Sequence, residues 1–301
     1  MRADPLYNLG LTNSLNNITT QEDTLTSELS SGLRVSTAST DPVAAAASIR
    51  MGSEIAVDDT FTQTASSLES RLQVADSTLG SAVTEVTSAI SLATEGINGT
   101  LSSSNVKTIA QQLSGIRDEV VSLANTSYSG SYLFSGTAAN TQPFSIDNST
   151  TPASAVYAGD NNTQYTQTPG GQKIAVSVSG SSLFSSSGAD VLGSLNRLIS
   201  DFSSGTASAS AQSDLTELSA GLNQLSAGQG VLGTSLASLQ SAATYASTDE
   251  ANVKAAQSSL VAADTSQVAT DLSSAEVQQK ALLSVMSSSV ATTSLFDYLN
   301  Q

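Results

Sequence analysis

The sequence contains no cysteine and no histidine among its 301 residues. It therefore offers no disulfide, no thiol nucleophile, no imidazole base and none of the usual ligands of zinc, copper or haem iron. Carboxylates, hydroxyls and a few amines are the groups that remain for chemistry. This composition argues against an enzyme, and we expect no catalytic residue, no cofactor and no bound metal.

Charge is also scarce, because charged residues make up 12% of the chain where about 25% is usual. The 10 basic and 26 acidic residues leave a net charge of −16. A surface with this excess of negative charge repels the phosphates of nucleic acids and the head groups of anionic lipids. We expect no nucleic-acid partner.

Long hydrophobic runs are missing as well. The longest purely apolar run extends from Val43 to Ala47, whereas a membrane span requires about 20 residues. The N-terminus places Arg2 and Asp4 close to Pro5 and lacks the apolar core of a signal peptide. We therefore expect a soluble chain without membrane insertion, and an export route other than a cleaved signal if the protein leaves the cell.

What the sequence does contain is apolar residues at helical spacing. Near the N-terminus they alternate steps of four and three, with Glu22 at the one position where the pattern demands another hydrophobe: Leu11, Leu15, Ile18, Leu25 and Leu29. This spacing is typical of a coiled-coil seam. Burying the five side chains is worth about 8 to 15 kcal/mol, so the helix requires a partner.

A second seam near the C-terminus is the candidate partner. It uses smaller residues, also contains a polar member at Gln279, and consists otherwise of Val268, Leu272, Ala275, Leu282, Met286, Leu295, Phe296 and Leu299. We predict that the two seams pair as a coiled coil. Residues 1–40 and 259–301 would then form one terminal assembly region.

Helical spacing also covers much of the chain between the termini, and predicts a helical rod domain from residues 41–130 and 190–258. Within residues 131–189 the period changes, because aromatic and β-branched residues fall between Asn, Thr, Pro and Gly clusters. This segment is predicted to be a β-rich outer domain. The expected fold is mainly α: an elongated antiparallel coiled-coil helical rod made from both ends of the chain, with a small inserted β domain.

Two further patterns are typical of enzymes but have plainer explanations here. The glycines of Gly228–Gly233 match a dinucleotide-binding loop, but that motif requires a preceding strand and this one lies inside a leucine heptad. The adjacent carboxylates Asp58 and Asp59, like Asp249 and Glu250, point about 100° apart on a helix. We expect both pairs on solvated helix faces.

Several segments resemble the flagellin-like family of bacterial flagella. The segment from Leu29 to Val35 is similar to one shared by flagellins and hook–filament junction proteins. Asp41-Pro42 followed by Val-Ala-Ala-Ala, and Tyr-Leu-Phe-Ser-Gly before the β-rich segment, resemble the junction proteins, the third hook-associated proteins. Thr40 departs from the pattern, which usually has an acidic residue there. The residues that carry the resemblance are Ser31, Gly32, Arg34, Asp41, Pro42, Tyr132, Leu133, Phe134 and Gly136.

The resemblance covers most of the helical chain and implies a structural, non-enzymatic adaptor that joins the hook to the flagellin filament. It implies export by the flagellar export apparatus without a cleaved signal peptide, and an extracellular place in the flagellum. The implied partners are copies of the chain itself, the first hook-associated protein, flagellin and a flagellar export chaperone. Flagellin itself is the alternative, and a secreted helical toxin or translocator with a β insert is a more distant one.

Overall fold

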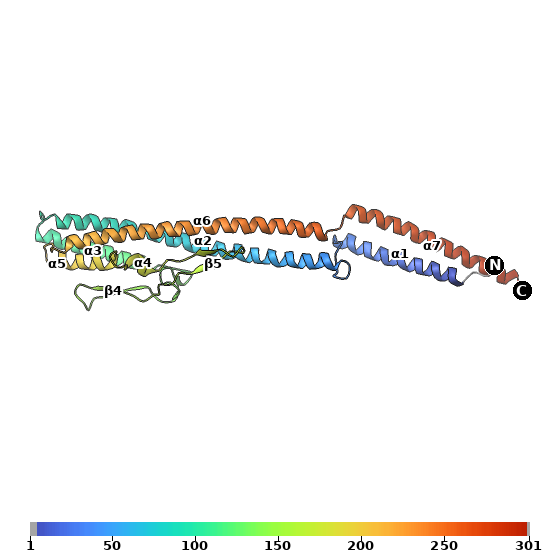
Figure 1. Ribbon diagram of the computed structural model, residues 1–301, viewed down its shortest axis with the longest axis horizontal. Coiled ribbons are helices and arrows are strands. Elements are labelled where there is room, and N and C mark those ends of the chain that lie inside the picture. Colours follow the sequence, from blue (N-terminus) through green and yellow to red (C-terminus); the bar gives the residue numbers. More distant parts are fainter. Residues whose placement is uncertain (1–4, 300–301) are drawn as a thin grey trace. The chain divides into compact units, whose positions relative to one another are not determined.

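The computed structural model describes the backbone of residues 5–299, and the side chains of Tyr7 and of residues 9–288. Within this range the chain is mainly helical, as predicted. The helices are α1 (Pro5–Ser31), α2 (Pro42–Ile97), α3 (Ser103–Ala124), α4 (Gly180–Phe184), α5 (Val191–Ser203), α6 (Ala211–Val261) and α7 (Thr265–Leu299) (Figure 1). None of the helices, over its described residues, is long and apolar enough to cross a membrane.

The chain divides into two compact units. Residues 1–56 and 249–301 form the first, and residues 57–248 form the second. The predicted boundaries near residues 40 and 259 fall inside the first unit, so the start of α2 and the end of α6 group with the terminal helices. The β-rich segment falls inside the second unit together with the helices on which it packs.

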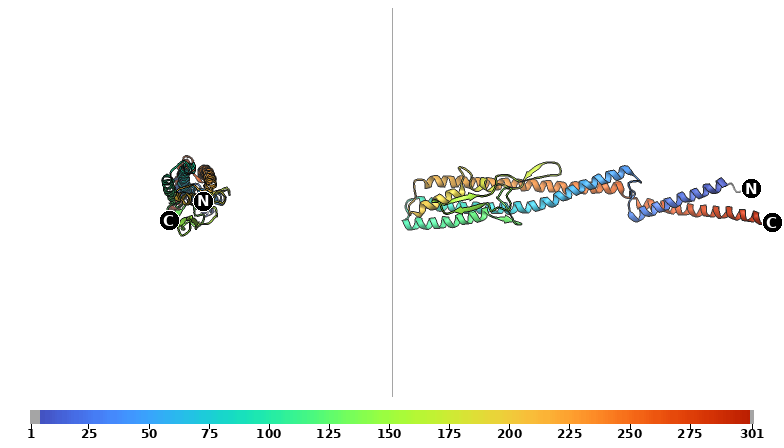
Figure 2. Two further views of the ribbon diagram at one scale, coloured as in Figure 1. Left: turned by 90° about the vertical axis from the view of Figure 1, so that its left-hand side faces the viewer. Right: turned by 90° about the horizontal axis from the view of Figure 1, so that it is seen from below.

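The first unit contains the helix pair that the terminal seams predict. Helices α1 and α7 lie side by side and run antiparallel (Figures 1 and 2). Glu22 of α1 meets Gln279 of α7, and the carbonyl oxygen of Gly32, just after α1, accepts a hydrogen bond from the backbone N–H of Ala263 at 2.9 Å. Gly32 has a φ of +69°, the left-handed conformation that commonly ends a helix.

The second unit has a continuous hydrophobic core contributed by its long helices. Buried residues recur along α2 and α6 at alternating steps of three and four, as the heptads predict. These residues include Phe61, Leu72, Leu79, Val86, Leu218, Leu225, Leu232 and Leu239. Helices α3 and α5 pack against each other and add Leu113, Leu195 and Phe202 to the same core.

Both long helices run without a break through their glycines. Helix α2 is continuous from Pro42 to Ile97 and passes through Gly52 and Gly80 without interruption. The Gly228–Gly233 pattern lies within α6, as its heptad context indicates. A Cβ atom on Gly228 would stand 2.2 Å from Cδ2 of Leu183, so this glycine permits a close approach between helices α6 and α4.

The β-rich segment forms three separate antiparallel hairpins in the described chain. Its strands are β1 (Ser127–Tyr128), β2 (Ser131–Tyr132), β3 (Phe144–Asp147), β4 (Ser154–Tyr157), β5 (Tyr165–Gln167) and β6 (Lys173–Ala175), paired in consecutive order. Strand β6 ends at Ala175, and Ser179 then caps α4 by accepting a hydrogen bond from the N–H of Ser182. Hairpin β3–β4 contacts α5 and α3.

Candidate assembly site

The predicted terminal seam lies largely along the contact between α1 and α7. On α1 the side chains of Leu11, Leu15, Ile18 and Leu25 are partly buried. Those of α7 comprise the buried Val268 and Ala275 and the partly buried Leu272, Leu282 and Met286. The remaining predicted members, Leu295, Phe296 and Leu299, lie outside the residues whose side chains are described. The seam is therefore covered on one side and still accessible on the other.

Leu29 departs from the predicted seam, because 39% of its side chain is exposed. It stands in the last turn of α1, two residues before the chain leaves the helix. The buried apolar side chain at this end of the pair is instead Val35, in the loop that follows. Helical spacing alone does not indicate where the covered face passes from a helix to a loop.

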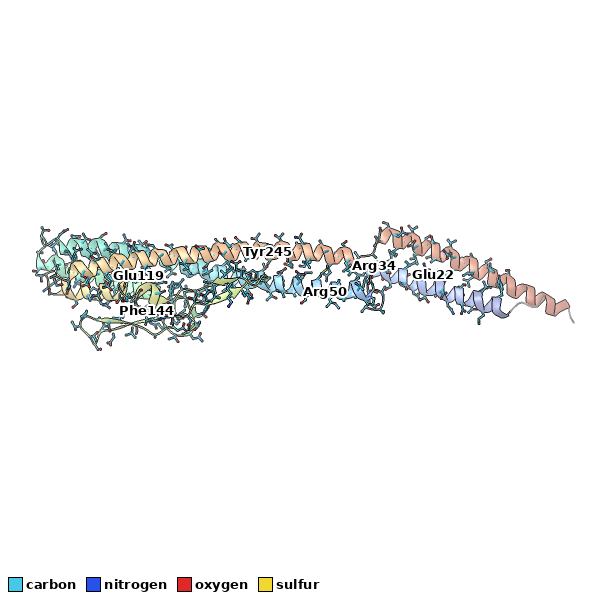
Figure 3. The ribbon with its side chains drawn as sticks, in the orientation of Figure 1. Glu22, Arg34, Arg50, Glu119, Phe144 and Tyr245 are labelled. Carbon is cyan, nitrogen blue, oxygen red and sulfur yellow. The ribbon has the colours of Figure 1, made fainter. Side chains whose placement is uncertain are left out.

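The motif residues from Ser31 to Arg34 hold together two connections that are distant in sequence. We name these connections the paired loops: residues 32–41, between α1 and α2, and residues 262–264, between α6 and α7. The backbone N–H of Arg34 donates to the carbonyl oxygen of Val261 at 2.8 Å. The guanidinium of Arg34 donates to the carbonyl oxygen of Leu260 at 3.1 Å and contacts a carboxylate oxygen of Asp41 at 3.3 Å (Figure 3).

Asp41 and Pro42 form the start of α2. A carboxylate oxygen of Asp41 accepts the backbone N–H of Ala44 at 3.0 Å, while Pro42 occupies the first helical position, where its missing N–H does no harm. The pKa of Asp41 lies below its ordinary value mainly because of the hydrogen bond from the N–H of Ala44, and to a smaller extent because of the Arg34 guanidinium. The ionised form therefore stabilises the fold above the unfolded pKa, and this contribution is lost as the pH falls through the folded pKa.

We expect Arg34→Ala to loosen the paired loops without unfolding either unit. The backbone bond to Val261 remains, so the loss is that of the side-chain bonds, about 0.5 to 1.5 kcal/mol for the bond to a neutral carbonyl. Hydrogen exchange at the amide of Ala263 should accelerate by about 3- to 10-fold. Arg50→Ala, which removes an exposed arginine of the same unit, is the control, and equal acceleration in both variants would contradict the assigned role.

A second group of motif residues lies where the chain enters the β hairpins. Leu133 and Phe134 are buried, and the ring of Phe134 packs edge-on against that of Phe184 with centroids 5.7 Å apart. Phe184 meets Phe144 in the same manner, also at 5.7 Å. Tyr132 pairs with Ser127 in the first hairpin. These rings form the core that joins the hairpins to α4.

Gly136, the last residue of this group, is fixed by a carboxylate that the motif does not include. Asp160 accepts the backbone N–H groups of Thr137 and Asn162, each at 2.9 Å, and also the hydroxyl of Thr137. These hydrogen bonds hold the pKa of Asp160 below its ordinary value, and the bond from the Thr137 hydroxyl has the largest effect. The hydroxyl of Tyr157 lies 2.7 Å from the backbone oxygen of Asp160.

The carboxylate pairs do not form a reactive site. The expectation of solvated faces is wrong for Asp58, which is 2% exposed, because this side of α2 belongs to the row of residues that faces inward. Its neighbour Asp59 is exposed and accepts a hydrogen bond from Gln63, and Glu250 pairs with Lys254 one helical turn later. No cluster of three or more Asp and Glu that could hold a metal ion occurs in the described part of the chain.

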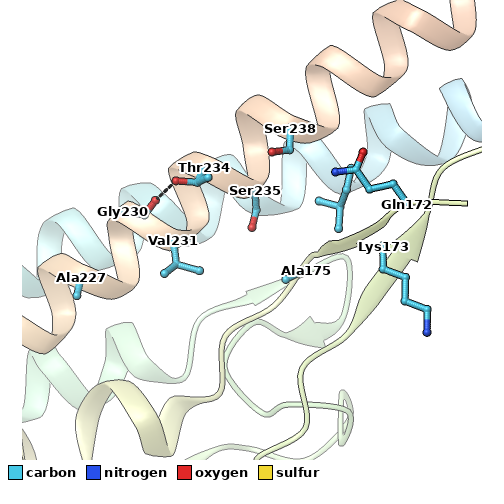
Figure 4. Close-up of a pocket in the computed structure, with 10 residues that line it drawn as sticks. Gln172, Lys173, Ala175, Ala227, Gly230, Val231, Thr234, Ser235 and Ser238 are labelled. Atoms are coloured by element: carbon cyan, nitrogen blue, oxygen red, sulfur yellow. Dashed lines mark hydrogen bonds between the residues drawn. The ribbon is translucent and has the colours of Figure 1, made fainter. Parts of the chain in front are cut away.

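A groove runs between α6 and the β5–β6 hairpin, as two adjoining hollows of about 560 and 660 Å³ (Figure 4). Both hollows are lined by Gln172, Thr234 and Ser238. Lys173 supplies the only charged group among the lining residues, and its side chain points away from α6 in Figure 4. The titratable side chains of the lining are Lys173 in one hollow and Tyr245 in the other, and the remaining lining residues are neutral.

The comparisons with known proteins agree with the resemblance seen in the sequence. Residues 7–139 match the family model of the bacterial flagellin N-terminal helical region. Flagellar hook-associated protein 3 of Escherichia coli K12 is 30% identical over 119 residues, which are 39% of this chain and 38% of that protein. The protein of the same name from Salmonella typhimurium is 29% identical over 164 residues, 53% of this chain and 49% of that protein. The matches thus span at most half of these relatives.

Solved structures share the fold at lower sequence identity. A putative flagellar hook-associated protein from Vibrio parahaemolyticus superposes with a TM-score of 0.64 at 18% identity, covering 74% of this chain and 100% of that one. The flagellar junction protein FlgL from Legionella pneumophila superposes with a TM-score of 0.59 at 16% identity, covering 72% and 100%. At these identities the likeness concerns the fold alone.

Proposed function

We propose that this chain, whose residues 7–139 match the family model of the bacterial flagellin N-terminal helical region, is a structural, non-enzymatic adaptor of the bacterial flagellum. In this proposal it joins the hook to the flagellin filament and polymerises through its terminal helices. It is exported by the flagellar apparatus without a cleaved signal peptide and takes its place outside the cell. Its partners are copies of itself, the first hook-associated protein, flagellin and a cytoplasmic export chaperone.

The pairing of the two chain ends is the observation that carries this proposal. Helices α1 and α7 bury a seam between them, but most seam side chains on α1 remain only partly buried. Apolar surface of this kind is unfavourable in an isolated molecule and favourable in a polymer, where neighbouring copies cover it. A surface completed by assembly is what a subunit of a tubular structure requires.

Two observations favour the junction over flagellin itself, which remains the alternative. The Asp41-Pro42 start of α2 resembles the corresponding segment of the junction proteins rather than that of flagellins. It also stabilises the structure, since Asp41 caps α2 and contacts Arg34. Both curated relatives reported above are named Flagellar hook-associated protein 3. Both observations support a role at the hook–filament boundary.

Deletion of the gene tests this function. A strain without the protein should make hooks that carry no filament and should excrete flagellin into the medium, and the full-length gene supplied in trans should restore filaments. Quantitative mass spectrometry of sheared filaments should find the protein at far lower abundance than the filament subunit. A protein that dominates sheared filaments would be flagellin, and normal filaments in the deletion strain would exclude both roles.

A further inference from the structure

Each terminal seam contains a polar residue, and the structure brings the two together. Nε2 of Gln279 donates a hydrogen bond to Oε2 of Glu22 at 2.7 Å, across the contact between α1 and α7. Both side chains are partly buried, and Figure 3 labels Glu22 on α1. The other carboxylate oxygen of Glu22, Oε1, is buried and accepts no hydrogen bond from the described residues. A carboxylate in this position is thus satisfied by one donor, and that donor is Gln279.

The Glu22–Gln279 bond defines a register along the antiparallel pair. In an antiparallel pair, moving up one helix by a few residues means moving down the other by about the same number. Counting from the Glu22–Gln279 bond in this way places Ile18 across from Leu282 and Leu25 across from Ala275. The competing registers are slips by one heptad, because they keep apolar residues opposite apolar residues elsewhere along the two seams. Such a slip would place Glu22 against Leu272 or Met286 and leave its carboxylate without a donor.

The same residue also discriminates between partners. If α1 paired with α1 of a second copy around this level, Glu22 would meet Glu22, and two carboxylates would share a partly buried site. If that pairing slid to avoid the contact, Glu22 would face a hydrophobic side chain such as Ile18. Of the two terminal helices, over their described residues, α7 is the one that presents a hydrogen-bond donor to Glu22, because Gln279 interrupts its apolar seam at that level.

We propose that Glu22 and Gln279 form a specificity pair that selects α7 as the partner of α1 and sets the register of the two helices. A single polar residue in a coiled-coil seam can fix register and partner at a cost in stability. The pair disfavours wrong associations more than it strengthens the right one. Replacing both residues by leucine should therefore raise thermal stability and reduce selectivity.

Disulfide trapping in the full-length chain tests the register directly, because the natural sequence contains no cysteine. Leu282→Cys is combined in turn with Ile18→Cys, which is in register, and with Leu11→Cys or Leu25→Cys, which are each one heptad away. Under mild oxidation the in-register disulfide should exceed each shifted one by about tenfold or more, the ratio that corresponds to one charge-assisted hydrogen bond. In the Glu22→Leu/Gln279→Leu background this ratio should fall toward one.

Partner selection has its own readout. Leu25→Cys alone reports parallel, in-register pairing of α1 with α1 of another copy, in which Glu22 also meets Glu22, as a disulfide-linked dimer. This dimer should be rare in the natural background and several-fold more abundant with Glu22→Leu/Gln279→Leu. The exchange Glu22→Gln/Gln279→Glu keeps a donor and an acceptor at this level but removes the carboxylate from α1. It should keep the register and still increase the dimer.

The matched control is Gln21→Leu/Gln278→Leu, which adds the same two leucines one position away, at exposed sites on the two helices. It should change neither the register ratio nor the dimer. If Glu22→Leu/Gln279→Leu also leaves both unchanged, the paired loops alone set the pairing and the proposal is overturned. The test reads helix pairing in the isolated chain, so its failure is distinct from failure of the flagellar role.

Discussion

Phe134→Ala is expected to lower the free energy of unfolding of the unit formed by residues 57–248 by about 3 to 5 kcal/mol. The ring is 1% exposed and packs against Phe184, which in turn contacts Phe144. Truncation would remove a full aromatic side chain and leave a cavity that three surrounding elements cannot close. The backbone oxygen of Phe134 also accepts the N–H of Gly180 at 2.7 Å, so relaxation toward the cavity would disturb the start of α4.

Urea unfolding of the full chain, followed by circular dichroism, measures this loss. The midpoint of the transition that belongs to residues 57–248 should fall by about 1 to 2 M. Tyr165→Ala is the matched control, because it also truncates an aromatic residue of the β-rich segment but at a position that is 62% exposed. A midpoint for Phe134→Ala that is no lower than that of Tyr165→Ala would show that the aromatic cluster is not a core.

The helices could be predicted from the sequence because their signals are local. Apolar residues at steps of three and four, Gly32 after α1 and Asp41-Pro42 at the start of α2 each act within a few residues, and the structure places the helix ends there. The continuity of α2 through Gly80 could not be predicted in this way. Glycine costs only about 1 kcal/mol in a helix, and the packing on both sides of it outweighs that cost.

The β-rich segment was predictable in kind but not in arrangement. Aromatic residues between turn-forming clusters indicate strands, yet nothing in the spacing tells whether the strands form one sheet or three hairpins. That choice depends on the helices, because Asn125 at the end of α3 exchanges two hydrogen bonds with the backbone of Phe144, at 2.8 and 2.9 Å. An asparagine in a Ser- and Asn-rich chain gives no advance sign of this role.

The terminal assembly site could likewise be predicted in part from the sequence. The two seams and their polar members were visible as patterns, and the contact between α1 and α7 follows from the need of each for a partner. The level at which they meet was not visible, because Glu22 and Gln279 are separated by 257 positions and heptads repeat identically. Arg34 stood out as a motif residue, but its contact with the end of α6 requires the two loops to be side by side.

Gly136→Ala is expected to destabilise the same unit by about 3 kcal/mol or more. Gly136 has a φ of +71°, a conformation that costs a residue with a side chain about 1 to 2 kcal/mol. In addition, a Cβ atom there would lie 2.2 Å from Oδ1 and 2.3 Å from the backbone oxygen of Asp160. The segment around Asp160 would have to move, and its bonds to Thr137 and Asn162 would be lost.

Gly130→Ala separates the two causes, because Gly130 has a φ of +81° but open space around its Cβ position. It should show the cost of the backbone conformation alone, and Gly136→Ala should exceed it. Nuclear magnetic resonance titration adds a second measurement: the pKa of Asp160, held low by Thr137 and Asn162 in the natural chain, should rise toward its ordinary value only in Gly136→Ala. The stability that this carboxylate provides above its unfolded pKa, and loses as the pH falls through the folded pKa, should shrink in parallel. Equal midpoints for the two variants, with an unchanged pKa, would mean that the contact between Gly136 and Asp160 does not hold the entry to the hairpins.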